Sequence, residues 1–224
     1  MADSPDRGEL LTALTTEHFT LQGARSQTMS ESSSRAALYI GAVSSTLVAL
    51  GFLGQLAPGG DTFNTFALTV LPTLYVLGVF TFVRLVECGA EDFRYGLAIN
   101  RIRHYYTEID PSQAHYFLLS GRDDFRGALA NMCIRDSWTQ FLFTMPSAVA
   151  VINALLAGVT VSLALVTTVA AALPVTVLTG MALGTTVLGL HLAYQVRRFA
   201  TMKANVAAVF PSTRPRPKLV RSPQ

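Results

Sequence analysis

The chain has 224 residues, of which 50% are hydrophobic and 14% are charged, and its formal net charge is +3. An average soluble domain carries about 25% charged residues, so this composition argues against an ordinary soluble domain. The longest uncharged block, residues 137–196, contains no Asp, Glu, Lys or Arg. A helix that crosses a bilayer needs about 20 mostly apolar residues, so this block holds two spans with a reversal between them. The sequence therefore predicts an integral membrane protein.

The N-terminal segment, residues 1–35, mixes acids with bases, and the apolar block after it is too long for a cleavable signal peptide. We therefore expect the first span to remain in the mature protein. Between residues 9 and 35, apolar side chains recur at three- and four-residue steps, which predicts an amphipathic helix. This helix is interpreted as lying along the membrane or packing on the cytoplasmic segment, with binding to a partner as the alternative.

Two uncharged blocks follow, residues 36–60 and 62–83, and a Pro-Gly-Gly turn separates them. Each block is long enough to cross a bilayer, and the short turn makes the two helices antiparallel neighbours. Residues 36–83 are therefore predicted to form the first transmembrane hairpin. Pro72 removes one backbone hydrogen bond from the second helix, so we expect a kink over residues 68–72.

Residues 84–136 form the sizeable polar segment between the spans. Residues 84–109 contain no proline and carry opposite charges at helical spacing, so we expect the second span to continue into the cytoplasm as a helix. Asp110 and the proline after it supply a new N-cap, which predicts a short helix through Leu119, and a further helix begins at residues 123–124. About fifty residues of this kind cannot bury a large core, so the segment must pack on the N-terminal helix or on another subunit.

The second transmembrane hairpin is predicted over residues 137–196. Trp138 and Phe141 are expected to anchor its entry at the membrane interface, and the reversal is expected between residues 166 and 174. The remaining residues, 197–224, are rich in Pro, Arg, Lys and Ser and are predicted to be a disordered tail. Anionic lipid would attract this basic tail.

The distribution of basic residues predicts the topology. All 17 Lys and Arg residues fall within residues 1–35, 84–136 and 197–224, and neither hairpin tip contains one. By the positive-inside rule, both termini and the middle segment lie in the cytoplasm. The predicted fold is all-α: a polytopic membrane protein with four transmembrane helices in two antiparallel hairpins and a cytoplasmic helical layer. No nucleic acid is expected as a partner, because the basic residues form no patch of their own.

Two charge pairs lie at the predicted membrane boundary. Glu31 and Arg35 are one helical turn apart before the first span, and Arg84 and Glu87 are one turn apart after the second. Because a short tip joins these spans, both pairs should lie at the same depth. We predict a cross-helix pairing of Arg35 with Glu87, or of Arg84 with Glu31. The alternative is that both arginines extend independently to lipid phosphates.

Two further groups of residues are candidate sites. An arginine and aromatic cluster could hold an anionic ligand such as a nucleotide, with anchoring at the membrane interface as the alternative; its members are Arg101, Arg103, His104 and Tyr105. Gly180 and Gly184 lie four residues apart, and small residues at this spacing let helices approach closely. They predict helix packing, either between the subunits of a homo-oligomer or within the monomer.

The sequence offers no pattern for catalysis. It contains no phosphate-binding glycine loop, no nucleophile elbow and no paired carboxylates within a span. The histidines show no metal-ligand spacing. We therefore assign no catalytic, cofactor-binding or metal-binding residue, predict no cofactor, and expect that the protein is not an enzyme.

Four strings of residues resemble an uncharacterised bacterial family of small four-span membrane proteins: Glu17–Gln22, Ser30-Glu31 with Arg35, Phe82–Glu87, and Ile99–Tyr106. The resemblance covers roughly the first half of the chain, implies a bacterial inner membrane as the location, and brings no activity with it. The layout is also similar to that of small membrane effectors of bacterial nucleotide-activated defence, which is a likeness of architecture alone. Separately, Met132–Ser137 is similar to the translation of a transposon-end adapter from sequencing libraries, so no function is assigned to Cys133, Arg135 or Asp136.

Two functions remain as hypotheses. The first is a non-enzymatic integral membrane protein that self-associates and signals, or acts as a membrane effector, through its cytoplasmic helices. The second is a subunit of a membrane enzyme or transporter whose partner supplies the chemistry. The absence of charged residues from the predicted spans favours the first hypothesis.

Overall fold

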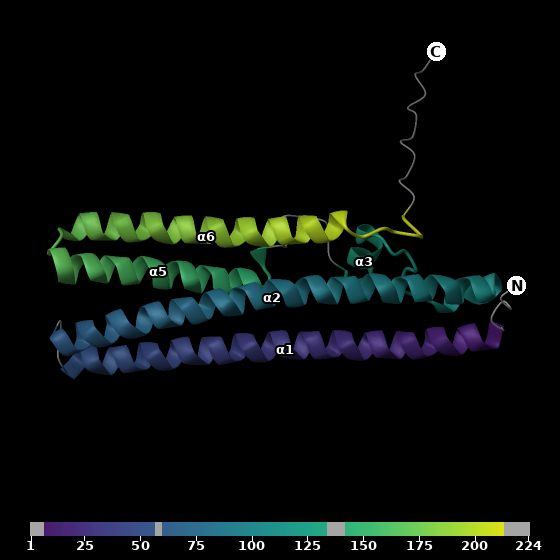
Figure 1. Ribbon diagram of the computed structural model, residues 1–224, viewed down its shortest axis with the longest axis horizontal. Coiled ribbons are helices and arrows are strands. Elements are labelled where there is room, and N and C mark those ends of the chain that lie inside the picture. The colour runs from purple at the N-terminus through teal and green to yellow at the C-terminus, as the bar shows by residue number, and fades with distance from the viewer. Residues whose placement is uncertain (1–6, 57–59, 134–141, 213–224) are drawn as a thin grey trace, which may run out of the picture. The chain divides into compact units, whose positions relative to one another are not determined.

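The described chain is a set of helices. The computed structural model describes residues 7–56, 60–133 and 142–212, and this part of the chain contains no strand. Four long helices account for most of it, as Figure 1 shows: α1 (Arg7–Leu56), α2 (Asp61–Ile109), α5 (Met145–Val169) and α6 (Leu173–Ala204). A 3-10 helix, η1 (Pro111–Tyr116), and the short helix α3 (Phe125–Asn131) follow α2. The prediction of an all-α fold is confirmed.

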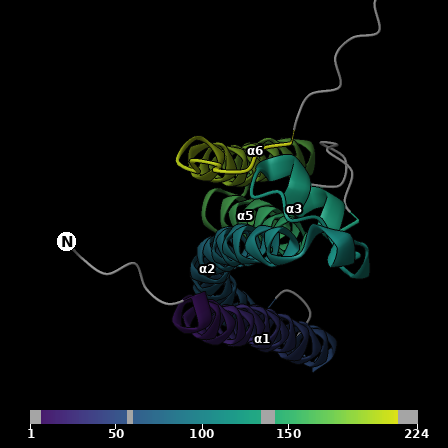
Figure 2. The same ribbon diagram turned by 90° about the vertical axis from the view of Figure 1, so that its right-hand side faces the viewer.

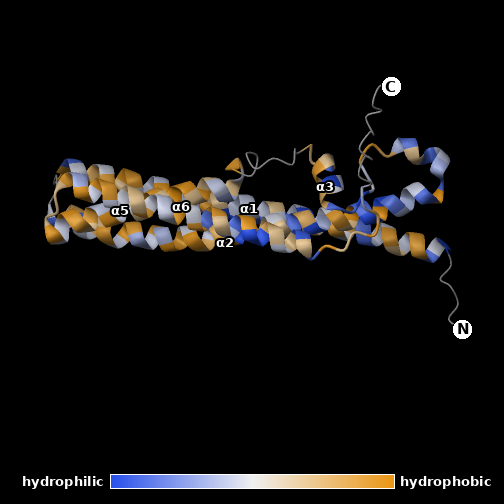
Figure 3. Ribbon diagram, turned by 90° about the horizontal axis from the view of Figure 1, so that it is seen from above, coloured by the Kyte–Doolittle hydropathy of each residue, from blue (hydrophilic) through white to orange (hydrophobic). Residues whose placement is uncertain are grey.

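All four long helices are long and apolar enough to cross a membrane, by length and composition. Helix α5 contains no charged residue in its 25 positions, and in Figure 3 the end of the molecule where α5 and α6 lie is coloured mostly pale to orange. Polar colours in the same view gather on α1 and α2 away from their apolar stretches. The length and composition of these helices therefore confirm the prediction of four helices that can span a membrane.

Helix α1 is longer than the predicted first span. The expected amphipathic helix at residues 9–35 and the span that follows are one helix of 50 residues. A separate helix along the membrane plane would need a break before the span, and the sequence supplies none: the serines around Glu31 remain helical. Glu31 and Arg35 form an ion pair of 2.8 Å across one turn, which stabilises the helix at this point. The predicted helix at residues 9–35 is therefore present, and it continues into the first apolar stretch without a break.

The capping residues after α2 act as predicted. Helix α2 ends at Ile109, where the sequence places its end. Asp110 caps η1, since its Oδ1 accepts a hydrogen bond of 3.0 Å from the Ser112 amide, and Asp124 caps α3 through a bond of 2.8 Å from the Gly127 amide. The predicted helix after Asp110 ends at Tyr116 and not at Leu119, and it is a 3-10 helix.

The last two helices turn back on each other at residues 170–172, inside the range predicted for the reversal. Helix α6 then continues to Ala204, so the predicted disordered tail does not begin at residue 197. The two arginines at 197 and 198 mark the end of the apolar stretch but are good helix formers, so the helix does not stop there. The interfacial anchors predicted at Trp138 and Phe141, and most of the first tip, lie outside the described residues.

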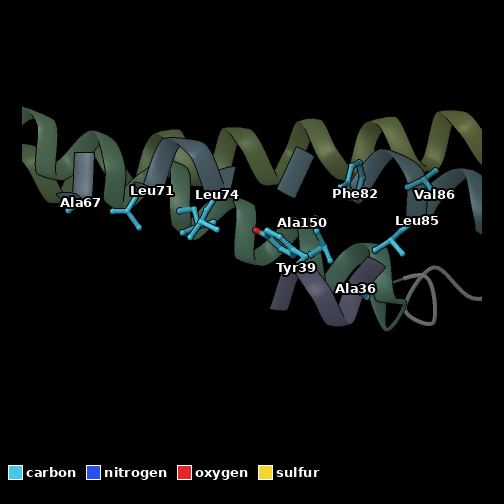
Figure 4. Packing of buried hydrophobic residues seen from close by; sticks show 11 residues of the cluster. Ala36, Tyr39, Ala67, Leu71, Leu74, Phe82, Leu85, Val86 and Ala150 are labelled. Atoms are coloured by element: carbon cyan, nitrogen blue, oxygen red, sulfur yellow. The ribbon is translucent and has the colours of Figure 1, made fainter. Parts of the chain in front are cut away.

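The chain forms two compact units. The span unit comprises residues 23–92 and 137–204, and the polar unit comprises residues 1–22, 93–136 and 205–224. In the span unit, buried side chains from α1, α2 and α5 form one apolar core, which Figure 4 shows: Ala36, Tyr39, Ala67, Leu71, Leu74, Phe82, Leu85, Val86, Val149, Ala150 and Leu156. Helix α6 lies beside α5 in Figures 1 and 2.

Candidate functional site

Arg84 is the centre of an ion-pair cluster in the span unit. Its guanidinium donates two hydrogen bonds of 2.8 Å to the carboxylate of Glu31 on α1 and one of 2.9 Å to Glu91 on α2. Glu31 also accepts a bond of 2.8 Å from Arg35. We call Glu31, Arg35, Arg84 and Glu91 the boundary cluster. The structure thus brings together Arg84 and Glu31, one of the two cross-helix pairs considered from the sequence.

Glu87 has a different partner from the one predicted. Its carboxylate accepts hydrogen bonds of 2.7 and 2.6 Å from the guanidinium of Arg198 on α6, and Arg35 is held by Glu31 instead. Glu87 and Arg84 lie three positions apart on α2, and they reach different neighbouring helices. A further pair joins α1 to α2, because Arg25 donates to Asp92 over 2.6 Å. Ion pairs therefore link three of the long helices within the span unit.

The arginines keep the carboxylates of this region ionised. Hydrogen bonds from Arg84 and then Arg35 lower the pKa of Glu31 to about 2. The hydrogen bond from Arg198 likewise lowers the pKa of Glu87, against the opposing effect of burial. These side chains are only partly buried, so each pair alone stabilises the fold modestly. The pairs fix which helices contact one another in this region: α1 with α2, and α2 with α6.

A buried polar chain, which we did not predict, crosses the span unit. The Tyr39 hydroxyl donates to Asn153 Oδ1 over 2.6 Å, and Asn153 Nδ2 lies 3.2 Å from His191 Nε2. His191 Nδ1 lies 2.8 Å from the carbonyl oxygen of Val187, which can only accept, so Nδ1 carries the proton and Nε2 accepts from Asn153. All three side chains are buried. Each hydrogen bond among these side chains thus has a donor and an acceptor.

A glycine makes room for this polar chain. A Cβ at Gly78 of α2 would collide with Asn153 Oδ1 and would lie 2.5 Å from the Tyr39 hydroxyl. Phe82, one turn further along α2, packs edge-on against the His191 ring with 4.4 Å between ring centroids. We call Tyr39, Gly78, Asn153 and His191 the polar node, and all four long helices contribute to it. The available sequence signal was the lone Asn and the lone His in the apolar blocks of α5 and α6.

A second polar contact joins α5 to α6 one turn from the node. Gln195 Nε2 donates to Thr144 Oγ1 over 3.0 Å, and Ser147 Oγ donates to Gln195 Oε1 over 3.3 Å. Gln195 is buried, so these bonds satisfy a polar side chain that would otherwise be costly to bury. The interface of α5 and α6 therefore contains fixed polar contacts at two levels.

The predicted glycine pair packs within the monomer. A Cβ at Gly180 would lie 2.7 Å from the carbonyl oxygen of Gly158 on α5, and one at Gly184 would lie 2.9 Å from that of Ala154. These positions therefore let the backbones of α5 and α6 approach closely. Of the two alternatives for this face, the structure shows packing inside one chain.

The predicted anionic-ligand cluster lies in the polar unit, where protein groups already engage it. Arg101 donates to Asp123 over 2.7 Å and to the carbonyl oxygen of Ala207 over 2.9 Å. Arg103 donates to Asn100 Oδ1 over 3.0 Å. His104 stacks on Phe210 with 3.8 Å between ring centroids, and Tyr105 is half-buried. Both arginines of the cluster thus have protein partners, and the Arg101 side chain remains 49% exposed.

Two adjacent carboxylates hold the segment after α6, residues 205–212, which we call the C-terminal strap. The buried Asp123 accepts hydrogen bonds from the amides of Val209 (3.0 Å) and Phe210 (2.7 Å). Asp124 accepts bonds of 2.7 and 2.9 Å from the amide and hydroxyl of Ser212. Burial raises the pKa of Asp123, but the two amides and Arg101 outweigh it, so the pKa is lowered overall. The strap is thus bound by ionised acceptors.

Replacement of Asp123 by asparagine is expected to loosen the strap. The substitution removes a charged acceptor from two amides, and a hydrogen bond to a charged group is worth about 1.5–3 kcal/mol. Amide hydrogen exchange at Val209 and Phe210 should accelerate by roughly 10- to 100-fold. Asp110→Asn, which changes an exposed carboxylate of the same unit, is the matched control and should leave both amides unchanged. Equal exchange in the two variants would contradict the role of Asp123.

Among the described residues, no three His, Cys, Asp or Glu side chains lie close enough together to hold a metal ion. Both cysteines are free thiols, Cys88 buried and Cys133 exposed.

No protein-family model, no curated protein and no solved structure matches this chain.

Proposed function

We propose that the protein is a non-enzymatic integral membrane protein that signals, or acts as a membrane effector, through its cytoplasmic helices. In this proposal the four apolar helices form two antiparallel transmembrane hairpins in a bacterial inner membrane. The polar segments form the cytoplasmic layer, and the protein acts by coupling that layer to the spans. The confinement of all 17 Lys and Arg residues to the segments outside the apolar blocks supports this orientation.

The observation that carries the proposal is the set of ion pairs where the apolar stretches end. Glu31 with Arg84 and Arg25 with Asp92 join α1 to α2, and Glu87 with Arg198 joins α2 to α6. Helices α1 and α2 have 50 and 49 residues, or about 75 Å each at 1.5 Å per residue. A bilayer with its headgroups is about 40–45 Å thick, so each helix continues well beyond it. A displacement outside the membrane would therefore reach the spans without crossing a flexible loop.

A charge swap tests this coupling. In bacteria that express the protein, Arg84→Glu should place like charges beside Glu31 and Glu91, let the helices separate, and lower the membrane potential reported by a voltage-sensitive dye. The double variant with Glu31→Arg should restore the Arg84–Glu31 pair in reverse and return the potential toward that of the wild type. Arg94→Glu, the same charge reversal at an exposed position of α2 outside the boundary cluster, is the matched control. Identical potentials for all variants at equal expression would contradict the proposal.

The proposed topology has its own test by cysteine labelling. In a background without native cysteines, cysteine at Asp61 or Ala171 should react with an impermeant reagent added to intact cells, and cysteine at Thr15 should react only after lysis. The native Cys88 cannot serve as the inner marker, because it is buried and would resist labelling on either side. Labelling of Thr15→Cys in intact cells would overturn the proposed orientation.

The polar node favours a second candidate function, a subunit of a membrane transporter or enzyme. Buried polar groups within membrane spans are costly and often mark functional sites. His191→Gln can keep a hydrogen bond to Asn153 but cannot carry a proton. Under this candidate, the variant should remain folded in the membrane and lose the activity of a co-expressed partner complex; under the first proposal, it should retain the membrane phenotype.

A further inference from the structure

The side chains of the polar node admit two patterns of hydrogen bonds, and the structure shows one of them. His191 donates from Nδ1 to the Val187 carbonyl oxygen, and its Nε2 accepts from Asn153 Nδ2 over 3.2 Å. Asn153 Oδ1 in turn accepts from the Tyr39 hydroxyl over 2.6 Å. This pattern requires a neutral imidazole, because a protonated Nε2 and the Asn153 amide nitrogen would both be donors.

A proton from water that binds Nε2 of His191 would reverse the pattern. The side-chain amide of Asn153 would turn over, so that its Oδ1 accepts from Nε2 and its Nδ2 donates to the Tyr39 hydroxyl oxygen. The hydroxyl proton of Tyr39 would then point away from Asn153. The turn is a rotation about one side-chain bond and needs no movement of the backbone. Both N–H groups of the charged ring would have an acceptor, which lowers the cost of burying the charge.

The side chains around His191 single it out as the group that changes its charge. The titratable or charged side chains nearest the node along the helices are tyrosines, arginines and one glutamate: Tyr39 and Arg35 on α1, Tyr75, Arg84 and Glu87 on α2, and Tyr194, Arg197 and Arg198 on α6. Helix α5 contains no titratable side chain. A histidine ordinarily changes its charge between about pH 5 and 8, whereas tyrosine, arginine and glutamate ordinarily do not. A proton taken up by the node in this range would therefore bind His191.

The position of His191 along α6 gives a proton a short route to the ring. His191 lies six residues before Arg197, where the apolar stretch ends. At 1.5 Å per residue this separation is about 9 Å, so the proton need not cross the hydrocarbon core. Ionisable side chains inside membrane-spanning helices are costly, and they commonly carry protons or bind ligands. The proposed function decides which side of the membrane supplies the proton, and the reversal of the hydrogen bonds does not depend on it.

We propose that the polar node is a proton-binding switch, in which protonation of His191 on α6 reverses the hydrogen bonds through Asn153 to Tyr39 on α1. Gly78 of α2 leaves the space in which Asn153 and Tyr39 meet. Tyr39 lies one helical turn from Arg35 of the boundary cluster. The binding of a proton on α6 therefore acts on the helix that carries two members of that cluster.

NMR spectroscopy of the full chain in lipid nanodiscs tests the first half of the proposal. With isotope-labelled histidine, the signal that His191→Gln removes belongs to His191. At about pH 8 this ring should carry its proton on Nδ1, which is the tautomer in the structure. On acidification to about pH 5, Nε2 should become protonated as well. His115→Gln, which changes an exposed histidine, is the matched control and should leave the His191 signal unchanged.

The second half of the proposal, the link to Tyr39, has its own signal. With tyrosine labelled at the ring carbon that bears the hydroxyl group, the signal that Tyr39→Phe removes belongs to Tyr39. Its chemical shift should change when the hydroxyl oxygen becomes an acceptor, over the same pH range as the His191 signal. This change should be lost in His191→Gln and retained in His115→Gln.

Three outcomes in the wild-type chain would overturn the proposal. The first is a His191 ring with its proton on Nε2 at about pH 8. The second is a His191 ring that stays neutral down to about pH 5. The third is protonation of His191 without a change at Tyr39, which would show a buried histidine with no link to α1. The membrane-potential test of Arg84 is carried out at constant pH, so a failure of the coupling proposal and a failure of this switch can be told apart.

Discussion

Replacement of Gly180 by leucine is expected to lower the free energy of unfolding by about 3 kcal/mol or more, at the upper end of the cost of overpacking a core. A Cβ at this position would lie 2.7 Å from the Gly158 carbonyl oxygen, and a backbone atom cannot move aside as a side-chain end can. Helices α5 and α6 would have to separate along their shared face. Thermal unfolding of the purified protein in lipid nanodiscs, followed by circular dichroism, would measure the loss.

Gly189 supplies the matched control on the same helix. A Cβ at Gly189 would have no neighbouring heavy atom within 4 Å, so Gly189→Leu should change the melting temperature little. The number of copies per particle should be the same in both variants, because the Gly180 face packs within one chain. A loss of copies in Gly180→Leu without a loss of thermal stability would contradict this assignment and would indicate a subunit contact.

Replacement of Gly78 by alanine is expected to have the second large effect, although it adds a single methyl group. That methyl group would occupy the position of Asn153 Oδ1 and would force apart the hydrogen bond from Tyr39. A buried polar group left without its partner costs about 1–3 kcal/mol, in addition to the steric strain. Unfolding in nanodiscs should therefore show a lower melting temperature.

Gly41→Ala provides the comparison for Gly78→Ala. Both glycines lie in long helices, but a Cβ at Gly41 meets nothing within 4 Å, so only the better helix propensity of alanine should act there. Gly41→Ala should therefore be neutral or slightly stabilising. Tyr39→Phe should destabilise the protein less than Gly78→Ala, because it removes one hydrogen bond without a clash. Equal stabilities for the two glycine variants would argue against the polar node as a packed unit.

Features that depend on nearby residues could be predicted from the sequence. The end of α2 at Ile109 follows from the Asp-Pro pair after it, and the N-cap of α3 follows from an aspartate that precedes a helical pattern. The four apolar helices follow from the length of the uncharged blocks. The continuation of α6 to Ala204 was missed because the change from apolar to basic composition resembles a boundary, although arginine is compatible with a helix.

Contacts between residues that are far apart in the sequence were harder to predict. Some could be given only as one of two alternatives, and others were missed. For Arg84 the sequence left open a pairing with Glu31 on α1 or an extension to lipid phosphates, and only the folded chain selects Glu31 together with Glu91. Tyr39 and Asn153 are 114 positions apart, so no local pattern links them. The contacts of the C-terminal strap could not be foreseen either, because they use backbone amides, which carry no sequence signature.

The polar node also bears on how the spans could conduct ions. A water-filled path needs polar groups that are free to exchange their partners with solvent, as channel walls do. At the node, the hydroxyl of Tyr39, the amide of Asn153 and both ring nitrogens of His191 are each committed to a protein partner. These polar groups therefore satisfy one another within the protein, and a water-filled path through them in a single copy would require these bonds to open.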